Sequence, residues 1–292
     1  MKYFISGANG QLGKEIRDSA KEYKNSEFDF FGRELDICNK TELDNYFLEN
    51  KNFDYFINCA AYTDVEKAEQ EPDTALDVNY KSLKNIIKVC NDHDITLIHI
   101  STDFVFDGNK KSSYNEEDAP NPISVYGDSK FKGEQLISDN CMKYIIIRTS
   151  WLYSRYGNNF VKKIIDISRK NDRISVVSDE IGTPTNAADL AKDILFIAEQ
   201  KLQKNSKTIS KLYHYSNVGS ISRYEFAREI IKTAGIDCDV VAVNSDHFNF
   251  MAKRPKNSIL DQSKIIKEYA LHIRSWDDSL KECIKNLASD EK

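Results

Sequence analysis

Two patterns of apolar residues alternate along the first half of the chain. Short apolar runs typical of buried strands cover residues 3–5 and 96–100, and between such runs apolar residues recur every three or four positions, as on one face of a helix. Strands that alternate with helices predict a doubly wound α/β fold with a parallel, Rossmann-type sheet. The expected strands are residues 3–5, 28–31, 53–61, 96–100 and 144–149, and the expected helices are residues 12–20, 40–50, 72–90 and 126–137.

The pattern becomes looser after Trp151. Its spacing predicts helices over 160–168, 189–198 and 224–234, and strands over 174–177 and 213–216. We therefore expect a Rossmann domain over residues 1–150 and a smaller mixed α/β domain over residues 151–292. Two segments of the second domain, about 174–200 and 213–216, are expected to return to the sheet.

The first strand leads directly into a glycine turn. Gly7 allows a tight turn, Gly10 lets backbone N–H groups approach a pyrophosphate, and Gly13 lets the following helix pack close to the sheet. The spacing is G-x-x-G-x-x-G, which an ordinary loop could also contain, but the preceding strand and following helix favour a dinucleotide site. The residues expected to contact the cofactor here are Gly7, Asn9, Gly10, Gln11, Leu12 and Gly13.

The end of the second strand bears on the choice of nicotinamide cofactor. An acidic residue there binds the adenosine ribose and selects NAD, whereas an arginine accommodates the 2′-phosphate of NADP. The strand ends in Gly32-Arg33, although Glu34 is close enough to reach the same ribose. Because a glycine opens space for a phosphate, we predict that NADPH is preferred, with some use of NADH. The residues expected at the cofactor are Arg33, Asp36 and Ile37.

The third expected strand ends in small residues. Cys59, Ala60 and Ala61 leave room for a ligand at the carboxyl end of the sheet, where doubly wound folds bind their ligands. A tightly packed strand end explains the same residues equally well. We expect the three to line the cofactor.

A tyrosine and a lysine four positions apart share one face of the helix expected over residues 126–137. A phenol with a pKa near ~10 is a poor acid at neutral pH, and the Lys130 ammonium would lower the pKa of Tyr126. Tyr80 and Lys84 have the same spacing, so the motif alone is weak. Tyr126, however, follows a strand that ends at Thr102, whose hydroxyl could meet the phenol. Thr102 could instead be a cap, and Lys130 a surface lysine.

The composition restricts the remaining possibilities. The chain of 292 residues is 40% hydrophobic and 30% charged, with a net charge of −5. It has no run of 18 apolar residues, and its basic residues are dispersed, so we expect a cytoplasmic protein that binds neither membranes nor nucleic acid. The six cysteines form no C-x-x-C pair, which argues against a zinc site.

Several longer segments match one family along the length of the chain. The sequence resembles the extended short-chain dehydrogenases/reductases and, within them, the dTDP-4-dehydrorhamnose reductase family. The matching segments include GANGQLG at 7–13, STDFVFDG at 101–108, NPISVYGDSKFKGE at 121–134, RTSWLY at 148–153, IGTPTNAADLA at 181–191 and RPKNSILD at 254–261.

The resemblance implies a reaction and roles for particular residues. NAD(P)H would reduce the 4-keto group of dTDP-4-dehydro-L-rhamnose to give dTDP-L-rhamnose, a precursor of cell-surface polysaccharide. Tyr126 would donate the proton, Lys130 would lower its pKa and hold the nicotinamide ribose, and Thr102 would bind the ketone or the phenol. The residues implied at the substrate are Asp64, Val65, Phe104 and Trp151 around the sugar and Arg254 at the diphosphate.

The chain also departs from the family pattern and leaves alternatives open. Phe104 replaces the usual tyrosine, Glu66 an aspartate and Ser154 a glycine. Some family members use magnesium, and Glu15 lies where one ligand could be, but no metal site is assigned. The protein is expected to be a monomer or homodimer. The alternative functions are a nucleotide-sugar epimerase or dehydratase on the same scaffold, and a non-catalytic subunit related to the regulatory subunit of methionine adenosyltransferase.

Overall fold

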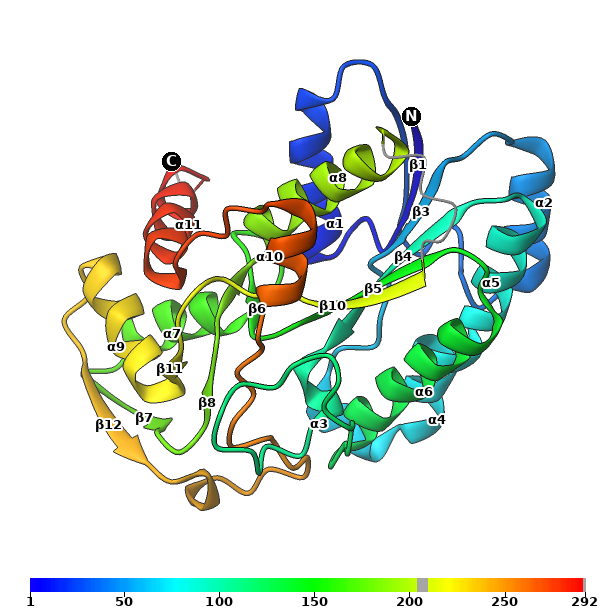
Figure 1. Cartoon of the computed structure of the whole chain (residues 1–292). Coiled ribbons are helices and arrows are strands. Elements are labelled where there is room, and N and C mark those ends of the chain that lie inside the picture. The colour runs from blue at the N-terminus through cyan, green and yellow to red at the C-terminus, as the bar shows by residue number, and fades with distance from the viewer. Residues whose placement is uncertain (204–209, 291–292) are drawn as a thin grey trace.

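A six-stranded parallel sheet forms the centre of the molecule in the computed structural model, which describes residues 1–203 and 210–290 (Figure 1). The strand order is β10-β5-β4-β3-β1-β2, and each neighbouring pair is parallel. This confirms the predicted Rossmann-type fold. The strands are β1 (Lys2–Ser6), β2 (Glu27–Phe31), β3 (Tyr55–Asn58), β4 (Thr96–Thr102), β5 (Tyr144–Thr149) and β10 (Ser210–His214).

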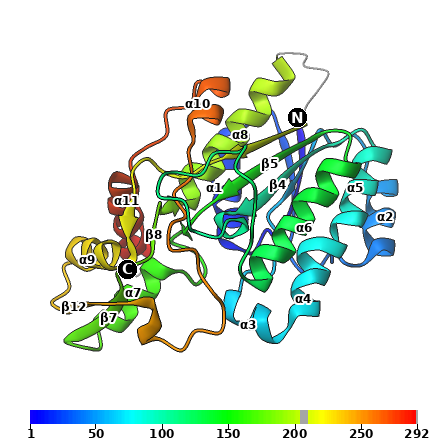
Figure 2. The same ribbon diagram turned by 60° about the horizontal axis from the view of Figure 1, so that its bottom comes forward.

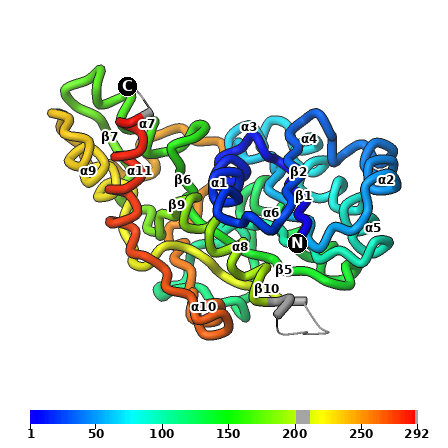
Figure 3. The backbone as a smooth tube through the Cα atoms, turned by 90° about the horizontal axis from the view of Figure 1, so that it is seen from above, coloured from blue at the N-terminus to red at the C-terminus, as the bar shows by residue number. Residues whose placement is uncertain are grey.

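Helices cover both faces of this sheet (Figure 3). Tyr3 and Ile5 pack on one face with α1, α8 and α10, whereas Phe4 points to the other face and joins the aromatic rings of Phe47 and Phe56. Burial on both faces explains why the strands read as apolar runs without alternation. The helices are α1 (Gln11–Ser19), α8 (Ala187–Gln203) and α10 (Ser263–Tyr269) on one face, and α2 (Lys40–Glu49), α5 (Leu83–Asp92) and α6 (Val125–Asn140) on the other.

A second lobe lies beside one end of the sheet and has its own apolar core (Figure 2). It contains α7 (Phe160–Ser168), α9 (Arg223–Ala234) and α11 (Trp276–Asp290), together with the parallel pair β7 (Arg173–Val177) and β12 (Asp239–Val243). The strand predicted over 174–177 therefore joins β12 and not the central sheet, because its partner strand comes from the same lobe. The strand predicted over 213–216 does return to the central sheet, as β10.

Short elements complete the described chain. The helix predicted over 72–90 is interrupted, because a π-helical turn at Asp77–Lys81 separates α4 from α5. No helix within residues 1–203 and 210–290 is long and apolar enough to cross a membrane. The remaining elements are α3 (Val65–Gln70), α4 (Pro72–Leu76), β6 (Leu152–Tyr153), β8 (Ile181–Gly182), β9 (Thr185–Asn186), β11 (Ile221–Ser222) and 3₁₀ turns at Ala20–Glu22, Asp103–Val105 and Ser245–His247.

Candidate active site

The glycine turn brings three backbone segments unusually close together. Gly7 has a positive φ of 69°, and a Cβ there would lie 2.5 Å from the backbone nitrogen of Ala60. A Cβ on Gly13 would lie 2.5 Å from the carbonyl oxygen of Gly7. Gly10 is exposed and is the N-cap of α1 without a side-chain hydrogen bond. The positive end of the α1 dipole and its first N–H groups are thus accessible, which fits the pyrophosphate of a dinucleotide.

The end of β2 lies next to this turn. A Cβ on Gly32 would lie 2.1 Å from Nδ2 of Asn9, so the space beside this glycine holds that side chain and, contrary to the prediction, is not left open for a phosphate. The Glu34 carboxylate accepts the backbone N–H of Gly32 at 2.6 Å. Arg33 is exposed and forms no hydrogen bond or ion pair with any described residue, so its guanidinium is accessible to an anion. Of the other residues predicted at the cofactor, Asp36 is exposed and its carboxylate accepts the N–H of Cys38, whereas Ile37 is buried in the core.

A cleft of about 610 Å³ opens at the carboxyl ends of the central strands. It brings together residues from the glycine turn, the ends of β3 and β4, α6 and the second lobe. Ala60 and Asp64 do not line it: Ala60 packs against Gly7, and the Asp64 carboxylate caps α3 by accepting the N–H of Lys67 at 3.0 Å. The predicted residues that line the cleft are Gly10, Gln11, Leu12, Cys59, Ala61, Val65, Thr102, Phe104, Tyr126, Lys130, Trp151 and Arg254.

Tyr126 lies on the first turn of α6, which a glycine brings against the end of β4. A Cβ on Gly127 would lie 2.2 Å from the carbonyl oxygen of Phe104, so no larger residue allows this approach. The Tyr126 and Phe104 rings meet edge to face at 5.5 Å. Burial raises the pKa of Tyr126 to about 12, although the neighbouring Thr102 hydroxyl acts in the opposite direction, and the lowering predicted from Lys130 is not found. Thr102 also caps the following turn by accepting the N–H of Phe104 at 3.2 Å.

Lys130 lies one turn further along α6 and is only 1% exposed, so it is not a surface lysine. Its Nζ donates to the carbonyl oxygen of Ile100 at 2.6 Å and lies 3.1 Å from Nε2 of His99. Burial lowers the pKa of Lys130 to about 8. The second pair with the same spacing differs, because Lys84 is exposed and its Nζ lies 5.9 Å from the Tyr80 ring, outside the cleft.

Two arginines from the second half of the chain face the same cleft. Arg223, at the start of α9, lies 3.5 Å from the ring centroid of Trp151, which has a positive φ of 46°. Burial lowers the pKa of Arg223 to about 10. Arg254 contacts the Glu66 carboxylate at 2.5 Å and lies 4.0 Å from the Phe250 ring.

Arg223 was not predicted, because an isolated arginine at a helix start carries no motif. Asn159 and Phe160 also line the cleft; they lie in GNNFVKK at 157–163, which matches the family, but no role was predicted for them.

The comparisons with known proteins agree with this geometry. The family model described as the RmlD substrate binding domain matches residues 1–289. The chain belongs to this family. A dTDP-4-dehydrorhamnose reductase of Aggregatibacter actinomycetemcomitans is 36% identical over 290 residues, which cover 96% of this chain and 97% of the relative.

Solved structures of relatives have the same fold over nearly the whole chain. A dTDP-4-dehydrorhamnose reductase of Clostridium acetobutylicum is 39% identical with a TM-score of 0.92, covering 99% of this chain and all (100%) of the relative. One of Bacillus anthracis, solved in complex with NADP, is 37% identical with a TM-score of 0.91, covering 98% of this chain and 99% of the relative.

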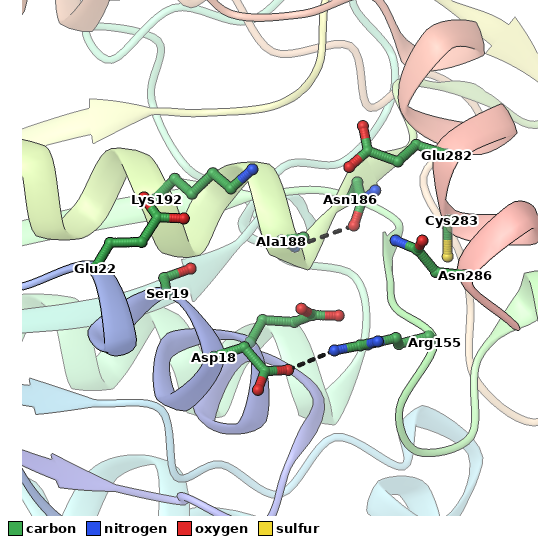
Figure 4. Close-up of a pocket in the computed structure, with 11 residues that line it drawn as sticks. Asp18, Ser19, Glu22, Arg155, Asn186, Ala188, Lys192, Glu282, Cys283 and Asn286 are labelled. Carbon is green, nitrogen blue, oxygen red and sulfur yellow. Dashed lines mark hydrogen bonds and ion pairs between the residues drawn. The ribbon is translucent and has the colours of Figure 1, made fainter. Parts of the chain in front are cut away.

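A second cavity, of about 170 Å³, lies between α1, α8 and α11 (Figure 4). Glu15, the residue considered above as a magnesium ligand, lines this cavity. Arg155 points toward Asp18 and pairs with its carboxylate at 2.6 Å. Glu15 is buried and accepts the Ser154 hydroxyl at 2.6 Å, and burial raises its pKa. Within the described residues no three His, Cys, Asp or Glu side chains are grouped so that they could hold a metal ion. The structure therefore gives Glu15 no metal-binding partners.

Proposed function

We propose that this chain reduces the 4-keto group of dTDP-4-dehydro-L-rhamnose to give dTDP-L-rhamnose. The supporting observation is that Thr102, Tyr126 and Lys130 meet in one cleft beside the glycine turn, in a chain that belongs to the family of these reductases. NADPH, when bound, supplies the hydride. The relative solved with NADP supports this choice of cofactor.

Tyr126 is the proton donor in this proposal. With a pKa of about 12 its phenol stays protonated at neutral pH, which suits a group that must give a proton to the forming alkoxide. The Thr102 hydroxyl lies beside the phenol and donates to Oδ1 of Asp103 at 3.1 Å, and in this proposal its oxygen binds either the phenol or the substrate ketone. Lys130, with a pKa of about 8, carries a proton at pH 7 and binds the nicotinamide ribose.

The second lobe, together with α3 and the turn after β4, supplies the groups that recognise the nucleotide-sugar. The Trp151 ring, together with Val65 and Phe104, forms an apolar wall for the deoxysugar. Arg254 and Arg223 bind the diphosphate, because guanidinium groups make paired hydrogen bonds to phosphate oxygens. Glu66 and the Phe250 ring hold the Arg254 guanidinium in place, and the Trp151 ring holds that of Arg223.

Arg33 binds the 2′-phosphate of NADPH in this proposal. Its exposed guanidinium lies at the end of β2, and the Glu34 carboxylate beside it already accepts a backbone N–H. The protein acts in the cytoplasm as a monomer or homodimer; both statements are predictions from the sequence.

The test is the consumption of NADPH against a panel of dTDP-4-keto sugars, with NMR identification of the product. One NADPH oxidised for each dTDP-L-rhamnose formed supports the proposal. An epimerase or dehydratase would turn over without consuming added NADPH, and a non-catalytic subunit would not turn over at all.

A further inference from the structure

A chain of buried polar side chains crosses the central sheet and ends at Lys130. The Ser6 hydroxyl donates to Oδ1 of Asn58 at 2.7 Å, and Nδ2 of Asn58 lies 3.0 Å from Nδ1 of His99. Nε2 of His99 lies 3.1 Å from Nζ of Lys130. All four residues are 1% exposed, and the strand register places Ser6 opposite Asn58 and Asn58 opposite His99. The spacing is thus set by the sheet.

One backbone group fixes the direction of every hydrogen bond in this chain. The N–H of Ala60 can only donate, and it points to Oδ1 of Asn58 at 3.1 Å. The amide NH₂ of Asn58 must therefore face His99, whose Nδ1 accepts. A neutral imidazole whose Nδ1 accepts carries its hydrogen on Nε2. His99 consequently presents an N–H donor to Lys130.

This donor favours one protonation state of Lys130 over the other. The carbonyl oxygen of Ile100 takes one N–H of Nζ, so the Nε2–H of His99 needs the nitrogen lone pair as its acceptor. Only the neutral amine has that lone pair. A doubly protonated imidazole does not fit either, because burial and then the nearby Lys130 hold the pKa of His99 well below its usual range.

We propose that His99, oriented by Asn58 and Ser6, is a positioning residue that stabilises the neutral amine form of Lys130 and holds its side chain against β4. The inference rests on the proposed function in giving Lys130 a part in catalysis. Burial also favours the amine, whereas the Glu134 carboxylate on the same helix and the Cys59 thiol favour the ammonium. Glu134 is itself paired with Arg148 at 2.6 Å, and the other titratable groups that line the cleft with Lys130 are Asp103, Tyr126, Arg223 and Arg254.

The neutral amine form of Lys130 arises during the proposed reaction. When Tyr126 has given its proton to the alkoxide, its phenolate takes a proton from the Lys130 ammonium, which becomes an amine. The N–H of His99 stabilises that amine until it regains a proton from water. His99 thereby makes it easier for Lys130 to give up its proton at neutral pH.

Asn58→Asp tests the proposal with a nearly isosteric change. The carboxylate still accepts from Ala60 and Ser6, but its other oxygen now accepts an Nδ1–H of His99. Nε2 then becomes an acceptor that favours the ammonium. The kcat/KM of the wild type should fall above a pH near 8, and in Asn58→Asp this fall should move to higher pH by about one unit or more.

Asn140→Asp is the matched control. It introduces the same charge at the end of α6, about 15 Å along the helix from Lys130 at ~1.5 Å per residue, and should leave the profile unchanged. An Asn58→Asp profile that coincides with the control profile would overturn the proposal.

The tautomer of His99 gives a second measurement that needs no turnover. Long-range ¹H–¹⁵N NMR of the wild type should show His99 with its hydrogen on Nε2, the signal being assigned among the five histidines with a His99→Gln variant. A hydrogen on Nδ1 would overturn the inference, even if Asn58→Asp failed to fold. If the wild type reduced no dTDP-4-keto sugar, the proposed function would fail, and the tautomer would still decide the question of His99.

Discussion

The two sides of the cleft are built in different ways. On one side, Thr102, Tyr126 and Lys130, the proposed catalytic cluster, lie on β4 and α6. Lys130 is held by buried contacts with His99 and Ile100 of β4, and Thr102 accepts the N–H of Phe104. On the other side, Arg223 and Arg254 are held by flat aromatic rings and carboxylates from α3 and the second lobe.

Under the proposed function, the residues that transfer the proton and the arginines that bind the substrate are therefore held in place by different kinds of contact. A rigid sheet fixes atoms to within a few tenths of an ångström, which proton transfer needs. Stacked arginines can adjust to a diphosphate while keeping their charge. Substitutions in the catalytic cluster should therefore change kcat, and substitutions of the arginines should change KM.

The largest effect is expected for Tyr126→Phe. The variant should fold and bind NADPH but lose about 10²- to 10⁴-fold in kcat, because the phenol proton is gone. Tyr80→Phe is the matched control, since Tyr80 has the same spacing to a lysine but lies outside the cleft. Steady-state kinetics of both variants measure the comparison, and equal losses would show that the catalytic cluster is wrongly assigned.

Arg33→Ala extends the comparison to the cofactor. We expect the preference for NADPH over NADH to fall by roughly 10- to 150-fold, because one charge-assisted hydrogen bond contributes about 1.5–3 kcal/mol. The ratio of kcat/KM for the two nucleotides measures this. A wild type that prefers NADH, or a variant with an unchanged ratio, would mean that Arg33 does not meet the 2′-phosphate.

Arg254→Lys and Arg223→Lys address the recognition side. Each should raise KM for the nucleotide-sugar by about tenfold and leave the affinity for NADPH unchanged, because lysine cannot make the paired contact or the flat stack. Arg173→Lys is the control, since Arg173 is exposed on β7. If kcat fell and KM did not rise, the proposed division between the two sides would be wrong.

The smallest effect concerns stability. Burial raises the pKa of Asp103 to about 6, whereas an unfolded aspartate has a pKa near ~3.9. The folded protein then binds the proton more tightly, so this stabilisation is complete below the unfolded pKa and is lost as the pH rises through about 6. Asp103→Asn cannot ionise, so its stability should not fall as the pH rises. At pH 8 it should be more stable than the wild type by up to about 2–3 kcal/mol.

Urea unfolding at pH 8 and pH 4 measures this difference. The advantage of Asp103→Asn should shrink at pH 4, where the wild-type carboxyl is protonated in the folded state. If the gain in stability of Asp103→Asn were the same at both pH values, the raised pKa of Asp103 would be wrong.

The sequence alone determined the central sheet and the parts of the site that are local. The sequence predicted the turn over residues 7–13, the helix that carries Tyr126 and Lys130, and the apolar strands. Turn chemistry, helical spacing and burial on both faces are each encoded within a few residues. The same local spacing could not separate Tyr126 from Tyr80 without the strand that precedes Tyr126.

The contacts between distant segments depend on tertiary packing and could not be predicted from the sequence. The pairing of β7 with β12 joins strands 66 positions apart at Arg173 and Asp239, and no local pattern specifies it. Arg223 reaches Trp151 across 72 positions, and His99 faces Lys130 because strand register sets its place. Such contacts depend on which surfaces are buried together once the whole chain has packed, and that information is not present in any single stretch of sequence.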